Sequence, residues 1–188
     1  MKKIILMAAA VLFGVAASAQ SAKFAHVNYE ELVALCPAAD SARDVIQKAQ
    51  KEYIDEIKVM QEEFANKYQQ YQQKASTWTA SVRETKEKEL SDMNTRIQEF
   101  QQTAQNDLQQ LQNNKMAPIY QKAREVVSDL AKKGGYIYVF ESSSVLYIDA
   151  AQSFDLTPSA RKELGIPAGR TLESLQAELQ AQAQAAQQ

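Results

Sequence analysis

The sequence predicts an α+β fold that is mostly α, with a long antiparallel helical hairpin on a small three-stranded β base. Only five of the 188 residues are glycine, and none lies between Gln20 and Lys133. Gln, Glu, Lys and Ala dominate that stretch, a composition typical of long helices. Apolar residues recur there in two stripes at helical spacing, whereas β-inclined segments occur only on either side of it. These observations favour one helical hairpin flanked by short strands.

Residues 1–19 are predicted to be a secretory signal peptide. Lys2 and Lys3 precede an apolar run over 4–15, and Ala17-Ser18-Ala19 forms a small-residue cleavage site. The run is shorter than the ~20 residues that span a bilayer. We therefore expect a soluble periplasmic protein that begins at Gln20.

The charge and cysteine content exclude several classes of protein. Loss of Lys2 and Lys3 changes the formal net charge from −2 to about −4. No basic stripe remains to replace phosphate counterions, so no nucleic acid partner is expected. Cys36 is the one cysteine and cannot form an intramolecular disulfide. A small buried apolar role is favoured for it, and an intermolecular disulfide is the alternative.

The two stripes predict an ascending helix over 41 to about 73 and a descending helix over 82–133. Residues 74–84 interrupt both patterns and are predicted to form the hairpin tip, while Pro118 is expected to kink the descending helix. Apolar residues spaced three and four apart lie on one helical face. The ascending stripe is Ile46, Ala49, Tyr53, Ile57, Met60, Phe64, Tyr68 and Tyr71, and the descending one is Leu90, Met93, Ile97, Phe100, Ala104, Leu108, Leu111, Ile119, Ala123, Val126 and Leu130.

The segment before the hairpin is predicted to contain one strand and one short helix. Residues 24–27 are β-inclined and form the expected first strand. Asn28 and Glu31 have the spacing of a capping box, which predicts a helix that Pro37 ends. Asp40 is then expected to cap the ascending helix.

The segment after the hairpin is predicted to contain two strands and one helix. Gly134-Gly135 should end the descending helix. Segments 136–141 and 145–148 are rich in β-branched and aromatic residues and are expected to pair through a turn at 142–144. Thr157 is expected to cap a short helix, with Pro158 at its first position. Residues 167–188 are expected to form a low-complexity tail of weak helicity.

No catalytic or metal-binding constellation is present in the sequence. His26 is the one histidine, and a structural role is favoured over that of a ligand or base. Ser142 to Ser144 lack the G-x-S-x-G context of a nucleophile. No phosphate-binding loop occurs, so no nucleotide or other cofactor is expected. We do not expect an enzyme.

Both ends and the glycine-poor hairpin together resemble the Skp or OmpH-like periplasmic chaperones, which hold unfolded outer-membrane proteins. The segments FAHVNYEELVALCP at 24–37 and GGYIYVFESSSVLYIDAAQSFDLTPSARKELGI at 134–166 carry the resemblance, which covers 23–166. It implies an ATP-independent homotrimer whose strands form a central body and whose hairpins, as tentacles, surround a cavity for the client. Such proteins are often strongly basic, whereas this chain is mildly acidic.

The resemblance assigns roles to regions and residues. Segments 20–40 and 118–166 would form the oligomerisation body, and 41–117 the tentacle. Most aromatic residues of the ascending stripe should pack against the other arm, and those facing the cavity should bind unfolded clients weakly. Trp78 is expected to touch clients or the membrane surface. The candidate client-binding residues are Tyr53, Met60, Phe64, Tyr68, Tyr71 and Trp78. The candidate oligomerisation residues are Phe24, Val27, Tyr136, Tyr138, Phe140, Val145, Leu146 and Ile148.

An exported coiled-coil scaffold or adaptor of the cell envelope is the alternative function. The hairpin alone fits either reading. Adaptor hairpins normally sit on domains of many more strands, so three strands flanking one hairpin favour the chaperone.

Overall fold

The computed structural model describes residues 22–185, so the predicted signal peptide lies outside the described part of the chain. The chain divides into two compact units. We call Val33–Lys122 the hairpin unit, and the described residues of Met1–Leu32 and Ala123–Gln188 the sheet unit. Helices α2 (Tyr29–Leu35) and α4 (Ala80–Gly134) each continue from one unit into the other.

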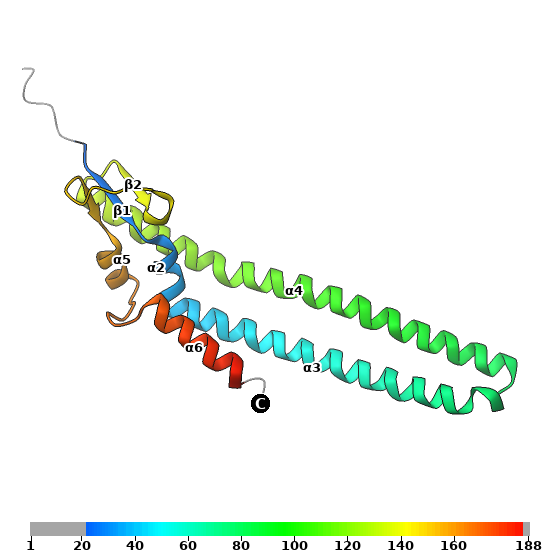
Figure 1. Ribbon diagram of the computed structural model, residues 1–188. Coiled ribbons are helices and arrows are strands. Elements are labelled where there is room, and N and C mark those ends of the chain that lie inside the picture. The colour runs from blue at the N-terminus through cyan, green and yellow to red at the C-terminus, as the bar shows by residue number, and fades with distance from the viewer. Residues whose placement is uncertain (1–21, 186–188) are drawn as a thin grey trace, which may run out of the picture. The chain divides into compact units, whose positions relative to one another are not determined.

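Two long helices side by side form the hairpin unit, in agreement with the sequence prediction (Figure 1). They are α3 (Pro37–Lys74) and the part of α4 within this unit, joined by a 3-10 turn, η1 (Ala75–Thr77). The tip is shorter than predicted, because helix continues to Lys74 and resumes at Ala80.

The start of α3 differs from the prediction. The helix begins at Pro37 rather than after Asp40, since proline has no N–H to satisfy and is preorganised for the first helical turn. Cys36 is therefore the N-cap residue, and it is buried as expected. Asp40 lies in the first turn, where its carboxylate accepts a hydrogen bond from Arg43.

The predicted stripes form the contact between the two arms. On α4, Met93, Ile97 and Ala104 are buried. The ascending stripe is half-buried except at Tyr68, which is 46 % exposed. The hairpin unit thus has a narrow core, because most other residues of the two arms are exposed.

Helix α4 ends as the two glycines predict. Gly135 has φ +69°, and the N–H groups of Gly135 and Tyr136 donate to the carbonyl oxygens of Lys132 and Ala131, which is a Schellman motif. Pro118 lies inside α4, which is helical on both sides of it. The kink at Pro118 stays a prediction.

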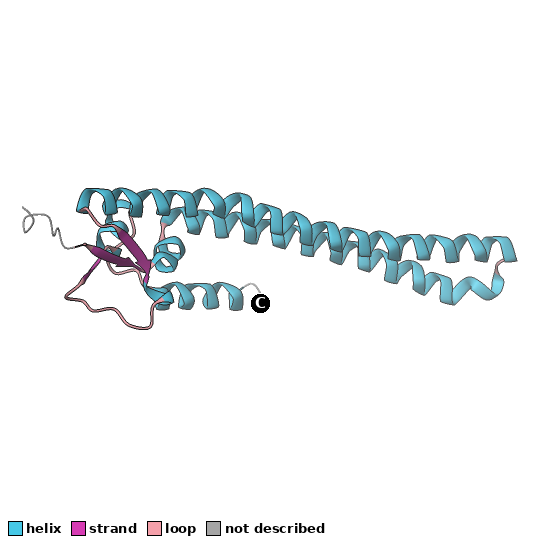
Figure 2. Cartoon of the chain, turned by 90° about the horizontal axis from the view of Figure 1, so that it is seen from above, coloured by secondary structure: helices cyan, strands magenta, loops and turns pink. Residues whose placement is uncertain are grey.

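The sheet unit is built on three parallel strands in the order β2-β1-β3 (Figure 2). Strand β1 (Phe24–Val27) has the predicted bounds and lies at the centre of the sheet. Strand β2 (Tyr138–Glu141) begins two residues later than predicted, because the Tyr136 N–H is used in the cap of α4.

The third strand was predicted in the wrong place. Residues 145–148 form no strand, and β3 is Ser153–Asp155. The third strand pairs instead with β1, to which it runs parallel, and a parallel neighbour needs a longer connection than a tight turn provides. The turn forms as a 3-10 segment, η2 (Ser142–Ser144), and the chain then passes to the other edge of β1.

Two side chains that were predicted to cap helices also contact other segments. The Asn28 side chain accepts from the Glu31 N–H at 3.0 Å, as predicted for α2. The Asn28 N–H, however, donates to the Thr157 hydroxyl at 2.9 Å, and the Glu31 carboxylate pairs with Arg161. Helix α5 (Thr157–Glu163) begins one residue earlier than predicted, and Asp155 rather than Thr157 accepts from its first N–H.

The last described segment is a regular helix, α6 (Leu172–Ala185), which corrects the expectation of a weakly helical tail. Thr171 and Ser174 exchange backbone-to-side-chain hydrogen bonds of 3.0 and 3.1 Å at its start. Leu175 is buried. The capping pair and this apolar contact fix a segment whose composition alone suggested little structure.

Candidate functional site

One face of the sheet carries an aromatic cluster. Because side chains alternate along a strand, Ala25 and Val27 are buried on one face of β1 while Phe24 and His26 lie on the other. The Phe24 ring stacks on Tyr138 at 6.4 Å and lies 6.5 Å from the ring of Phe140. Tyr138 and Phe140 remain 61 % and 46 % exposed. We call this the open face of the sheet.

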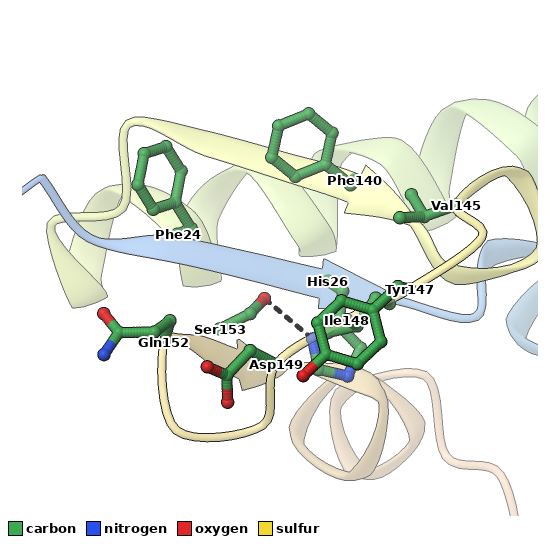
Figure 3. A pocket seen from close by; sticks show the side chains of 9 residues that line it. All are labelled: Phe24, His26, Phe140, Val145, Tyr147, Ile148, Asp149, Gln152 and Ser153. Carbon is green, nitrogen blue, oxygen red and sulfur yellow. Dashed lines mark hydrogen bonds between the residues drawn. The ribbon is translucent and has the colours of Figure 1, made fainter.

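A cavity of about 300 Å³ adjoins the open face (Figure 3). The His26 Nδ1 lies 2.9 Å from the Ser153 hydroxyl, a hydrogen bond that gives the histidine a partner within the sheet. The remaining wall comes from the chain that follows η2. The cavity is lined by Phe24, His26, Phe140, Val145, Tyr147, Ile148, Asp149, Gln152 and Ser153.

Several predicted oligomerisation residues lie around this face, but not all. Val27 is 3 % exposed and belongs to the core of the sheet unit. Tyr136 stacks on Phe154 at 5.8 Å, outside the strands' ladder. Val145 and Ile148 line the cavity, whereas Leu146 is fully exposed, at 107 % of the reference surface. The sequence predicts a common site for these residues because it predicts a strand over 145–148, and that strand does not form.

Two candidate client-binding tyrosines pack within the hairpin unit. The Tyr53 ring lies 5.9 Å from Phe100 of the other arm, and its hydroxyl donates to Asp107 at 3.0 Å, which raises the pKa of Tyr53. The Tyr71 ring lies 5.9 Å from that of Trp78 at the tip, and its hydroxyl donates to Glu87, which raises the pKa of Tyr71. These aromatic side chains help to hold the arms together.

The other candidates lie along α3. Phe64 stacks on Tyr68 at 6.1 Å, as two residues four apart on a helix can do. Met60 and Phe64 are half-buried, and Tyr68 is the most exposed of the six candidates. Its ring is therefore the most available to a partner.

An ion-pair cluster between the arms was missed by sequence reasoning, which treated such charges as solvated faces. Glu89 of α4 accepts hydrogen bonds from Lys67 of α3 and, at 2.9 Å, from Lys86. The hydrogen bond from Lys67 has the largest effect and that from Lys86 adds to it, and together they lower the pKa of Glu89 from 4.5 to about 2. The pairing depends on the register of the arms, which one sequence does not reveal.

Within residues 22–185, no group of three or more His, Cys, Asp or Glu side chains is placed to hold a metal ion. None of the helices in that range is both long enough and apolar enough to cross a membrane. Ser142 to Ser144 lie in η2, where Glu141 accepts from Ser143 at 3.3 to 3.4 Å.

Residues 23–164 match the family model described as Outer membrane protein (OmpH-like). The chain belongs to the OmpH-like family. This OmpH-like chain is 28 % identical to the chaperone protein Skp of Yersinia enterocolitica over 165 residues, covering 85 % of this chain and 97 % of the relative. It is 26 % identical to the chaperone protein Skp of Pectobacterium atrosepticum over 155 residues, covering 82 % and 93 %.

The fold of the OmpH-like chain agrees with that of a solved structure. An OmpH-like outer membrane chaperone from Caulobacter crescentus superposes with a TM-score of 0.68 at 12 % identity, covering 76 % of this chain and 83 % of the other. The predicted fold class is confirmed. The curated relatives are chaperones, in agreement with the expectation that the chain is not an enzyme.

Proposed function

We propose that this OmpH-like chain is an ATP-independent periplasmic holdase chaperone, which binds unfolded outer-membrane proteins and prevents their aggregation. The observation that carries the proposal is the extent of the similarity to the Skp chaperones, which spans more than nine-tenths of their length. The similarity therefore includes the hairpin unit and the sheet unit together.

The open face supports assembly into a homotrimer. A sheet normally buries its apolar face against another layer, yet Tyr138 and Phe140 stay exposed here. Exposed aromatic patches of this kind mark surfaces that bind a partner. In the proposed trimer the sheet units of three copies cover one another, and the hairpin units enclose a cavity for one client.

Client contacts are proposed for the six hairpin residues named from the sequence. Tyr68 contributes most, because nearly half of its side chain is available, while Tyr53 and Tyr71 contribute less because each packs within the hairpin. Exposed aliphatic residues add weak apolar contacts; they include Val45, Ile54, Val59 and Val82. The formal net charge of −2 makes general electrostatic attraction of acidic clients a poor basis for capture.

The experiment is a mass measurement by light scattering on the chain that starts at Gln20, alone and with an unfolded outer-membrane barrel. A trimer that takes up one client in soluble form, and that suppresses light scattering from the diluted barrel, is the expected result. Bovine serum albumin at equal mass serves as the control for crowding.

A different result would favour the scaffold or adaptor. A monomer or dimer that leaves barrel aggregation unchanged is incompatible with the proposed holdase. A trimer that does not bind the barrel would support the proposed assembly and contradict the proposed client.

A further inference from the structure

The two long sides of the hairpin unit differ in charge. On one side, Lys67 of α3 donates to Glu89 of α4. Asp107 accepts from the Tyr53 hydroxyl and lies about five turns from Glu89, so it belongs to the same flank of α4. Charged side chains thus join the arms along this side, which we call the ion-pair side.

The opposite side carries no charged residue within 47–72 of α3 or 91–112 of α4. Each residue of a helix turns by about 100°, which places every side chain relative to the apolar stripe of its helix. The flanks across the stripes from Lys67 and Glu89 lie together, because the two helices are antiparallel (Figure 1). They carry a series of amides, which on α4 recur at every third or fourth residue. The amides are Gln47, Gln50, Gln61 and Gln72 on α3, and Asn94, Gln98, Gln101, Gln105, Gln109 and Gln112 on α4.

These amides are available to a ligand. All are exposed except Gln101, which is half-buried. Within residues 22–185, none of their side chains makes a hydrogen bond. Ile54 and Tyr68, which are 56 % and 46 % exposed, lie on the same side of the hairpin unit. We call this uncharged surface the amide side.

Amide side chains match the peptide group in their hydrogen bonding. A peptide group carries one donor and one acceptor, and a glutamine side chain offers donors and an acceptor of the same kind. A chain bound on the amide side leaves no charge of the hairpin buried without a partner, which would be costly. Ile54 and Tyr68 add apolar contacts. The surface therefore suits an unfolded chain whatever the order of its side chains.

We propose that the amide side is the client-binding surface of the hairpin unit and that it holds an unfolded chain chiefly by its backbone. The surface extends over roughly 40 Å, which about twelve residues of extended chain span. A folded protein has paired most of its backbone groups, so a client that folds no longer offers them. A client is favoured over a second hairpin because the backbone groups of α3 and α4 are already paired within each helix. The inference rests on the proposed holdase and specifies its surface.

The first test places charges on the amide side. Gln61→Glu combined with Gln98→Glu should raise, by roughly tenfold, the concentration of this chain that half-suppresses aggregation of an unfolded outer-membrane barrel, because bound client would bury unpaired charges. Lysine at the same two positions should have the same effect. Both losses should persist in about 1 M salt, where a Debye length of about 3 Å screens long-range attraction and repulsion.

The matched control makes the same change on the ion-pair side. Gln70 of α3 and Gln110 of α4 are exposed glutamines on that side of the same two helices. Gln70→Glu combined with Gln110→Glu should suppress aggregation as wild type does. Circular dichroism and Tm should be alike for all these variants. Equal suppression by the two glutamate pairs would overturn the proposal.

The second test distinguishes amide contacts from apolar contacts. Gln61→Leu combined with Gln98→Leu keeps the side uncharged but removes two amides. Suppression should weaken by roughly fivefold, as expected for the loss of two hydrogen bonds of ordinary net strength. Suppression that is unchanged or stronger would show that the surface binds by apolar contact, and would overturn recognition of the backbone.

These outcomes separate the inference from the proposed function. A wild-type chain that leaves barrel aggregation unchanged would contradict the holdase itself. A wild-type chain that suppresses aggregation no better than the charged amide-side variants would overturn the inference while the holdase stands. Light scattering of each variant without client gives the mass of the assembly. A mass that changes only in the amide-side variants would make this surface a contact between copies and overturn the inference.

Discussion

Lys67 on α3 donates a hydrogen bond to Glu89 on α4, which joins the two arms of the hairpin unit by an ion pair. Lys86 donates to the second oxygen of the same carboxylate at 2.9 Å. The side chains of Lys67 and Glu89 are 37 % and 34 % exposed, so salt screens their attraction in part.

The hairpin unit should lose a contribution to stability in acid because of this pair. The folded-state pKa of Glu89 lies at about 2, below its ordinary 4.5, so the pair stabilises the fold above pH 4.5 and its contribution is lost as the pH falls toward 2. Thermal unfolding should give a lower Tm for Glu89→Gln than for wild type at pH 7, and the difference should vanish near pH 2. Glu62→Gln is the control, since Glu62 lies 4.0 Å from Lys58 on the same helix. A constant difference across this pH range would contradict the assignment.

Thr157→Val should destabilise the sheet unit. The Thr157 hydroxyl accepts from the Asn28 N–H at 2.9 Å, and the Thr157 side chain is buried. Valine has nearly the same shape but leaves that N–H without its acceptor, a cost of about 1–3 kcal/mol in the free energy of unfolding by urea. Thr157→Ser retains the oxygen and should cost less. Equal stability of the two variants would mean that the bond contributes little.

Gly135→Ala should destabilise the chain by roughly 1–2 kcal/mol. Gly135 has φ +69°, a conformation in which a Cβ clashes with its own backbone, although nothing else lies within 4 Å of that Cβ. Gly169→Ala is the matched control, since its Cβ would also meet nothing within 4 Å and its φ is not in the left-handed region. Urea unfolding of both variants measures the difference in their free energies of unfolding. Equal midpoints would contradict a specific cost at Gly135.

Tyr68→Ala should weaken the suppression of barrel aggregation and leave Tm nearly unchanged. The 46 % exposed ring contributes little to the hairpin core but is available to a client. Tyr53→Ala is expected to lower Tm and to change the suppression of barrel aggregation less, because the Tyr53 ring lies against Phe100 and its hydroxyl donates to Asp107. Aggregation assays and thermal unfolding of both variants test this contrast. If Tyr68→Ala captures the barrel like wild type, Tyr68 is not a client contact.

The helical half of the fold was predictable because it is encoded locally. The spacing of apolar residues specified both arms, the glycines specified the end of α4, and residues 24–27 had the composition of the strand that forms there. Each of these signals depends on neighbours within a few residues of one another, which a single sequence contains in full.

Features that depend on distant pairing were not predictable in the same way. Residues 145–148 have higher β propensity than Ser153–Asp155, yet the latter form β3 because they reach the free edge of β1. Glu31 was expected to serve its own helix, and Arg161, 130 residues away in sequence, pairs with it instead. Among the candidate residues, the exposure of Leu146 and the packing of Tyr53 both follow from such tertiary placement.

The central position of β1 sets an order of events during folding. Both of its neighbours in the sheet come from the far end of the chain, and the Asn28 to Thr157 bond spans 129 residues. Contacts this distant in sequence form slowly, whereas the backbone hydrogen bonds within helix α3 are local. A chain made from its N-terminus therefore keeps Phe24–Val27 without either neighbour until about three-quarters of it has been synthesised. Roughly the last fifty residues supply both strands that pair with β1. The protein that is proposed to shield unpaired strands of other chains therefore carries an unpaired strand of its own until those residues have been made.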